Sequence, residues 1–136
     1  MKLSAEQRDA MLAAAMLVRS QAHAPYSRFR VGAAVLSSSG RVFLGCNVEN
    51  LSYGLSCCAE RNAIAAAVAG GMQPGGLAAV VVVGDTPEPI SPCGACRQVI
   101  AEFAAADCSI TGANLAGQTR SWTIDGLLPD RFKAEL

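Results

Sequence analysis

Apolar residues recur at helical spacing in three parts of the chain, and each part carries a helix boundary signal. Ser4 followed by Gln7 forms a capping box at the start of the first part. A pair of glycines ends the second part, and a proline begins the third. The pattern predicts helices over residues 4–21, 58–68 and 92–105.

Shorter apolar runs predict strands between and after these helices. One run contains four consecutive valines, which is typical of a central strand buried on both faces. A Ser/Gly turn signal joins the first two runs into a hairpin. The predicted strands cover residues 31–36, 41–48, 77–83, 108–112 and 120–124. The chain contains no repeat and no low-complexity segment.

Length and charge limit the classes of protein to consider. A chain of 136 residues fits one domain, 1–136, with a moderate core. Eleven basic and eleven acidic residues cancel, so the charge expected of a nucleic-acid or membrane-surface binder is missing and a small neutral partner is favoured. Residues 1–21 are too polar for a secretory signal, and no apolar run approaches the roughly 20 residues that span a bilayer. We therefore expect a cytoplasmic protein.

Six cysteines admit two interpretations, a disulfide framework or a metal site. Disulfide frameworks serve small secreted domains, so metal binding or chemistry is favoured here. Cys93 and Cys96 have the spacing that brings two thiolates to one Zn²⁺, and Cys58 is a candidate third ligand. Three protein ligands leave the fourth position of a tetrahedral zinc open to water, as in catalytic sites. Glu60 is the candidate proton carrier for that water.

Cys58 lies at the N-terminus of one predicted helix, and Cys93 and Cys96 lie at the N-terminus of another. Helix dipoles there stabilise thiolates and lower their pKa. Residues two apart on a helix face different directions, but Cys58 and Glu60 can reach one metal that lies off the helix end, because side chains tilt toward that end. We expect Arg61 and Arg97 to offset the remaining negative charge.

The other candidate ligands have weaker support. His23, the only histidine, lies in a predicted loop, and we interpret it as a surface residue. We interpret Cys46, Cys57 and Cys108 as small core residues, because they lack ligand spacing and free cysteine is often buried. A structural zinc module or a Cys-x-x-Cys redox protein remains open on spacing alone. Neither a structural zinc site nor a redox motif explains why Glu60 follows Cys58, the candidate third ligand, by two residues.

Asn47 and Glu49 end the second strand of the hairpin. They are two residues apart, so on an extended backbone both side chains point the same way and present an amide and a carboxylate to one ligand. Such a pair can bind vicinal hydroxyls. It can equally cap the next turn, and the sequence does not separate the two roles. Phe29, just before the first strand, is more typical of the core than of a contact.

At these motifs the sequence resembles the cytidine deaminases of pyrimidine salvage over nearly its whole length. The Cys-x-Glu and Pro-Cys-x-x-Cys patterns are the known signature of zinc deaminases. The matching segments are 25–27 with Phe29, 31–33, 45–50, 52–55, 58–61, 91–98 and 127–129 with Phe132. The resemblance implies a three-layer α/β/α fold around a mixed five-stranded sheet, assembled as a homotetramer.

The resemblance also implies roles for individual residues. Cys58, Cys93 and Cys96 would bind Zn²⁺, and Glu60 would carry protons between water, ring N3 and the leaving amine as cytidine becomes uridine. The substrate contacts implied are Asn47 and Glu49 on the ribose, Phe29 near the sugar and base, the Ala59 amide on the pyrimidine oxygen, Phe132 on a neighbouring subunit's base and Tyr53 at a subunit junction. Leu51 and Cys57 depart from the family pattern, so the loop before Cys58 can differ in packing.

Two related activities compete with this interpretation. An antibiotic-directed aminohydrolase of the blasticidin deaminase type shares the zinc motifs and the chain length. We expect such an enzyme to lack the glutamate at position 49 that a ribose requires, so a nucleoside is favoured. A polynucleotide-editing deaminase needs a basic channel and loops for flanking nucleotides, which a short neutral chain does not offer.

Overall fold

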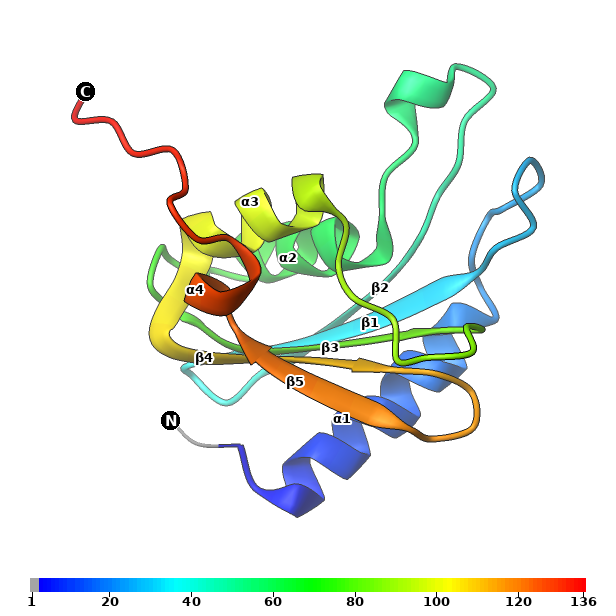
Figure 1. The fold of residues 1–136 in the computed structure, drawn as a ribbon, viewed down its shortest axis with the longest axis horizontal. Coiled ribbons are helices and arrows are strands. Elements are labelled where there is room, and N and C mark those ends of the chain that lie inside the picture. The colour runs from blue at the N-terminus through cyan, green and yellow to red at the C-terminus, as the bar shows by residue number, and fades with distance from the viewer. Residues whose placement is uncertain (1–2) are drawn as a thin grey trace.

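The computed structural model describes residues 3–136; residues 1 and 2 of the predicted domain 1–136 lie outside that range. The described chain contains four α-helices and five strands, with one turn of 3-10 helix at Tyr53–Leu55 (Figure 1). In order, they are α1 Ala5–Arg19, β1 Val31–Ser37, β2 Val42–Cys46, α2 Ala59–Ala69, β3 Leu77–Gly84, α3 Gly94–Phe103, β4 Ala104–Ala113, β5 Thr119–Thr123 and α4 Ile124–Leu127.

The strands form one mixed sheet in the order β2-β1-β3-β4-β5. The central pair β3 and β4 is parallel and the other neighbours are antiparallel. A parallel pair needs a crossover connection, and α3 provides it between β3 and β4. The mixed five-stranded sheet implied by the resemblance is confirmed.

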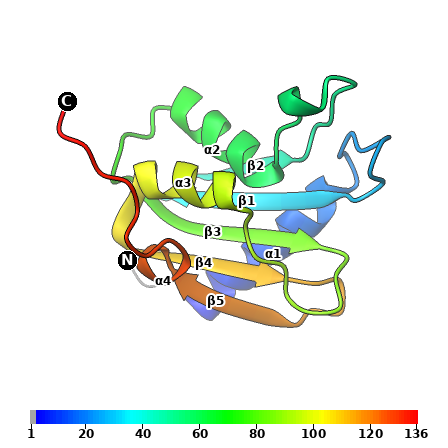
Figure 2. The ribbon, with the colours of Figure 1, turned by 45° about the horizontal axis from the view of Figure 1, so that its top comes forward.

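Helices cover both faces of this sheet. Figures 1 and 2 show α1 on one face and α2, α3 and α4 on the other. The four valines of β3 alternate between two core clusters: Val80 and Val82 pack with α2 and α3, and Val81 and Val83 pack with α1. Every residue of β3 is buried, as the valine run predicts. The three-layer α/β/α arrangement is confirmed, with the cysteine-bearing helices together in one layer.

The predicted elements are present, with corrections at their ends. The capping box of α1 is formed, but the helix ends at Arg19 rather than at residue 21. The third helix ends at Phe103, two residues before the predicted limit, because Ala104 pairs with Leu77 in the parallel ladder. Alanine favours a helix, and strand pairing overrides that preference here. The short helix α4, capped by the Thr123 hydroxyl, was not predicted because four residues are too few to show a period.

No helix within residues 3–136 is long and apolar enough to cross a membrane.

Gly45 lets α2 pack directly on strand β2. A Cβ atom at this position would lie 2.4 Å from the Ala63 nitrogen and 2.5 Å from the Ala59 carbonyl oxygen, both in the backbone of α2. We expect Gly45→Ala to lower the free energy of unfolding by about 1–3 kcal/mol, because overpacking forces the helix away from the strand. Urea denaturation measures this change. Gly54→Ala is the control, since its Cβ would meet nothing within 4 Å. Equal stability of the Gly45 variant and wild type would contradict this packing.

Candidate metal centre and active site

The three candidate ligands lie at the N-termini of two neighbouring helices. Cys58 is the N-cap residue of α2 and Cys93 is the N-cap residue of α3. Neither side chain makes a capping hydrogen bond to its own helix. Cys96 lies in the first turn of α3 and is fully buried. The two helix starts therefore bring three thiols to one point, as the spacing predicts.

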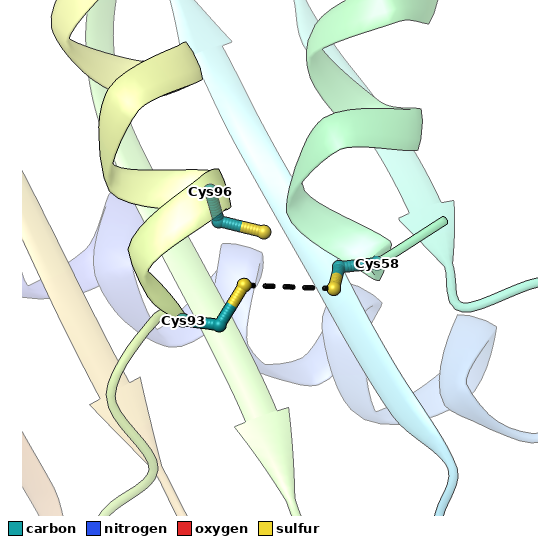
Figure 3. Close-up of side chains that lie close together, drawn as sticks. All are labelled: Cys58, Cys93 and Cys96. Atoms are coloured by element: carbon teal, nitrogen blue, oxygen red, sulfur yellow. Dashed lines mark hydrogen bonds between the residues drawn. The ribbon is translucent and has the colours of Figure 1, made fainter. Parts of the chain in front are cut away.

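The three sulfur atoms converge closely enough to hold one metal ion. All three Sγ atoms lie within 4.8 Å of one another, and those of Cys58 and Cys93 are 3.8 Å apart (Figure 3). A tetrahedral zinc with Zn–S bonds of about 2.3 Å separates its sulfur ligands by about 3.8 Å. No other His, Cys, Asp or Glu among residues 3–136 joins the group. The arrangement fits zinc with three thiolates and leaves one corner of the tetrahedron free of protein ligands.

The surroundings of Cys58 favour its thiolate. Hydrogen bonds from Cys96 and from Arg61 lower the pKa of Cys58 to about 5. The Arg61 guanidinium donates from Nη2 to the Cys58 sulfur at 3.4 Å, and the pKa of Arg61 is raised by the same contact. Its Nε is buried and has no hydrogen-bond partner among the described residues. Arg61 thus offsets thiolate charge at this site, as expected from the sequence.

Arg97 does not have the role expected of it. Its guanidinium donates to two backbone carbonyls, from Nε to Pro92 at 2.8 Å and from Nη1 to Leu127 at 2.9 Å. The side chain bridges the loop before α3 and the last residue of α4, and neither bond is to a sulfur. The expectation that Arg97 neutralises the thiolates was wrong, because sequence adjacency to Cys96 does not fix the direction of a long side chain.

Glu60 is buried in the first turn of α2, with 4% of its surface exposed. Burial, and to a smaller extent the negative charge of Cys58, raises the pKa of the Glu60 carboxyl to about 7. A hydrogen bond with the Cys96 side chain partly opposes this rise. The carboxyl therefore lies within electrostatic reach of two candidate ligands, on the same helix end. Ala59, between Cys58 and Glu60, is fully buried as the first residue of α2.

Asn47 and Glu49 both hold the loop that precedes β1. The Asn47 amide donates to the Phe29 carbonyl and accepts from the Val31 amide, each at 2.8 Å. The Glu49 carboxylate accepts hydrogen bonds from both the backbone and the hydroxyl of Ser27. These bonds, led by that of the Ser27 hydroxyl, lower the pKa of Glu49. Ser27 was part of a recognised motif, but the sequence alone assigned it no role.

The predicted aromatic contacts fall in two places. Tyr53 is 74% exposed and packs edge-on against Tyr26, with ring centroids 5.8 Å apart. Both rings border a cavity of about 310 Å³ that Glu49 also lines. Phe29 is exposed rather than in the core as its residue type suggested, and it lies beside Gly84, where an added Cβ would be 3.2 Å from its ring. Phe132 is 82% exposed in the C-terminal tail, which leaves α4 on the opposite side of α3 from the loop at residues 49–56 (Figures 1 and 2).

The remaining cysteines and the histidine lie outside the thiol cluster. All six cysteines are free thiols. Cys108 is buried, which raises the pKa of its thiol to about 12, in agreement with a core role. Cys46 and Cys57 are only half-buried, so their assignment to the core was wrong. His23 is exposed, as predicted, and its backbone pairs with Val48.

Comparison with known proteins identifies the family to which this arrangement belongs. The family model for the cytidine and deoxycytidylate deaminase zinc-binding region matches residues 5–111. The chain belongs to this deaminase family. Membership confirms the predicted resemblance, the enzyme class and zinc as the cofactor, and it decides against a structural zinc module or a redox protein.

Individual members of the deaminase family align over nearly the full chain. A cytidine deaminase of Halalkalibacterium halodurans is 46% identical over 128 residues, covering 94% of this chain and 96% of that protein. A cytidine deaminase of Sporosarcina psychrophila is 44% identical over 127 residues, covering 93% and 92%. The crystal structure of cytidine deaminase from Burkholderia pseudomallei has a TM-score of 0.88 at 50% identity, covering 91% of this chain and 98% of that one.

Proposed function

We propose that the protein hydrolyses cytidine and 2'-deoxycytidine to uridine and 2'-deoxyuridine, with release of ammonia. One observation carries the proposal: three thiols at two helix N-termini meet beside a buried carboxyl. The relatives named cytidine deaminase support the choice of substrate. The reaction adds the oxygen of water to C4 of the cytosine ring, and the amino group leaves as ammonia.

Cys58, Cys93 and Cys96 are proposed to hold the zinc ion. The two helix N-termini and the Arg61 guanidinium favour anionic sulfur at this position. Zinc with three protein ligands supplies Lewis-acid activation of water at neutral pH. The protein's contribution is to place the thiolates and to keep the fourth position free of side chains.

Glu60 is proposed to move the protons. A carboxyl whose pKa lies near the working pH can both accept and donate a proton, and burial gives Glu60 a pKa of about 7. It takes a proton from the attacking water and delivers it to ring N3, which makes C4 electrophilic. Glu60 then takes the remaining water proton from the hydroxyl now on C4 and passes it to the departing amine, so that ammonia leaves as the C4 carbonyl forms.

Four further residues are proposed to hold the nucleoside. The Ala59 amide, at the start of α2, meets the pyrimidine oxygen, and Phe29 packs near the sugar and base. Asn47 and Glu49 bind the ribose hydroxyls. Glu49 already accepts bonds from the loop at residues 26–27, but a carboxylate offers about four acceptor positions, so a hydroxyl can be added without breaking them.

We propose that four copies of the chain assemble, with Tyr53 at a subunit junction and Phe132 reaching the base in a neighbouring subunit. The support is exposure: both rings are largely exposed in the single chain, as are Leu51 and Leu55 in the loop that contains Tyr53. Large apolar side chains grouped on a surface mark interaction sites. Light scattering after gel filtration tests the assembly, and a mass of one chain would refute it.

We also propose a cytoplasmic location and a small-molecule substrate without a nucleic-acid polymer. The free cysteines support the location, since reducing compartments preserve thiols. The balanced charge supports the small-molecule substrate, since a nucleic-acid binder is usually basic. Cell fractionation tests the location. Incubation with single-stranded DNA containing cytosine, followed by base analysis, tests the substrate class.

Loss of ultraviolet absorbance from cytidine tests the proposed reaction. Purified protein is incubated with cytidine, free cytosine or blasticidin S, with and without a zinc chelator. We expect chelator-sensitive loss with cytidine, and a much lower kcat/KM for the other two, because a site built for ribose hydroxyls discriminates strongly against ligands that lack them. A higher kcat/KM for blasticidin S would replace the proposal with the antibiotic deaminase.

A further inference from the structure

Arg97 joins the start of helix α3 to the end of helix α4. Its Nε donates to the Pro92 carbonyl at 2.8 Å, and its Nη1 donates to the Leu127 carbonyl at 2.9 Å. Its backbone amide donates to the Cys93 carbonyl at 3.0 Å. One residue thus contacts the peptide units on both sides of the Cys93 Cα atom and also the last residue of α4.

Cys93 depends on its backbone for its position more than the other candidate ligands do. Cys96 is fully buried and Cys58 is half-buried, whereas Cys93 is exposed. An exposed side chain has few packing contacts to restrict it, so the turn at residues 92–94 must direct its sulfur. Pro92, which opens that turn, is buried, and its carbonyl receives the Arg97 guanidinium.

We propose that Arg97 is a positioning residue that holds the Cys93 turn for zinc and couples this turn to the C-terminal segment that follows Leu127. The inference rests on the zinc role proposed for Cys93. A charged donor on a carbonyl makes a strong hydrogen bond, and a part-buried carbonyl that loses its donor is destabilised. Without the guanidinium, the turn and the end of α4 lose their shared anchor, and the C-terminal tail loses this polar attachment to α3.

The two-carbonyl contact requires arginine rather than a positive charge alone. The planar guanidinium presents donors in a fixed fork, and here two of them reach carbonyls on different elements. A lysine offers one compact ammonium on a flexible stem and cannot reproduce this fork. If Arg97 acted only by charge on the nearby thiolates, lysine would replace it. Arg97→Lys therefore separates positioning from electrostatics.

The rate of zinc release to an excess of a chromogenic chelator tests the inference. We expect zinc-loaded Arg97→Lys and Arg97→Gln to release the metal roughly 10-fold to 100-fold faster than wild type, the usual effect of losing a residue that orients a ligand. Arg41 provides matched controls, because its Nη1 donates to the Gly70 carbonyl at 3.0 Å, at the end of α2 away from Cys58. Arg41→Lys and Arg41→Gln should release zinc at the wild-type rate. Wild-type release by Arg97→Lys, or equal acceleration in both series, would overturn the inference.

A second measurement uses wild-type protein and so does not depend on the folding of a variant. Coupling between two sites is reciprocal, so zinc at the Cys93 turn must stabilise the end of α4. We expect added zinc to slow hydrogen exchange at the Leu128 amide, which donates to Ile124. Unchanged exchange there, with slower exchange at α3, would refute the coupling. Neither measurement requires turnover, so an absence of cytidine hydrolysis would refute the proposed function and leave this inference standing.

Discussion

Glu60→Gln is expected to retain zinc and lose most turnover. The amide has nearly the shape of the carboxyl but cannot accept and return a proton, and general acid–base help of this kind is worth roughly 10² to 10⁴ in rate. The thiol cluster is untouched, so zinc content should remain one ion per chain. Steady-state kcat for cytidine and metal analysis of the same preparation give both quantities.

Glu102→Gln is the matched control for this variant. Glu102 is an exposed glutamate on α3, so the same chemical change there should leave kcat at the wild-type value. A near-normal kcat in zinc-loaded Glu60→Gln would mean that another group carries the protons. Loss of zinc from this variant would instead indicate that Glu60 contributes to metal binding.

Cys96→Ser is expected to abolish both zinc retention and turnover. Cys96 is fully buried, so in the variant the serine hydroxyl takes the position of the sulfur. Water from the solvent cannot enter there to act as a ligand instead. A neutral hydroxyl is a far weaker zinc ligand than a thiolate. We expect zinc affinity to fall by more than about 100-fold, which exceeds the usual loss from residues that merely orient a ligand. Competition with a chelator of known affinity measures it.

Cys46→Ser controls for the general effect of replacing a cysteine by serine. Cys46 is a half-buried free thiol that does not belong to the group of three. Its variant should bind one zinc per chain and deaminate cytidine at the wild-type rate. Full zinc content in Cys96→Ser, or zinc loss from Cys46→Ser, would assign the metal to a different set of sulfurs.

Hydrophobic patterning predicted the framework well, because the pattern reports burial directly. The valines of β3 are the clearest case, since they supply both core clusters. The hydrophobic pattern did not predict structure that depends on only a few residues. Ala104 joins a strand through pairing with Leu77, and the four residues of α4 depend on a Thr123 cap. Leu77 is far from Ala104 in sequence and leaves no local signal, and Thr123 is adjacent to α4 but caps a helix too short to show a period.

The metal site was predictable for a different reason. Cys93 and Cys96 are close in sequence, and Cys58 and Cys93 were both predicted to lie at helix starts, so the thiols could be placed with little knowledge of the tertiary structure. The direction in which a long side chain points could not be predicted from sequence spacing. Arg97 turns to the carbonyls of Pro92 and Leu127, 5 and 30 residues away in sequence. Such contacts depend on how α3 and α4 pack, which no motif encodes.

Titration of the metal-depleted protein with zinc tests the central claim most directly. The claim is that three thiolates hold one zinc beside Glu60 and that this centre deaminates cytidine. Protein stripped of metal is given increasing amounts of zinc, and ammonia release from cytidine is measured at each addition. We expect no release without metal, a linear rise with added zinc, and a break at one zinc per chain. Ammonia release from the metal-free protein, or none after one zinc per chain is bound, would contradict the account.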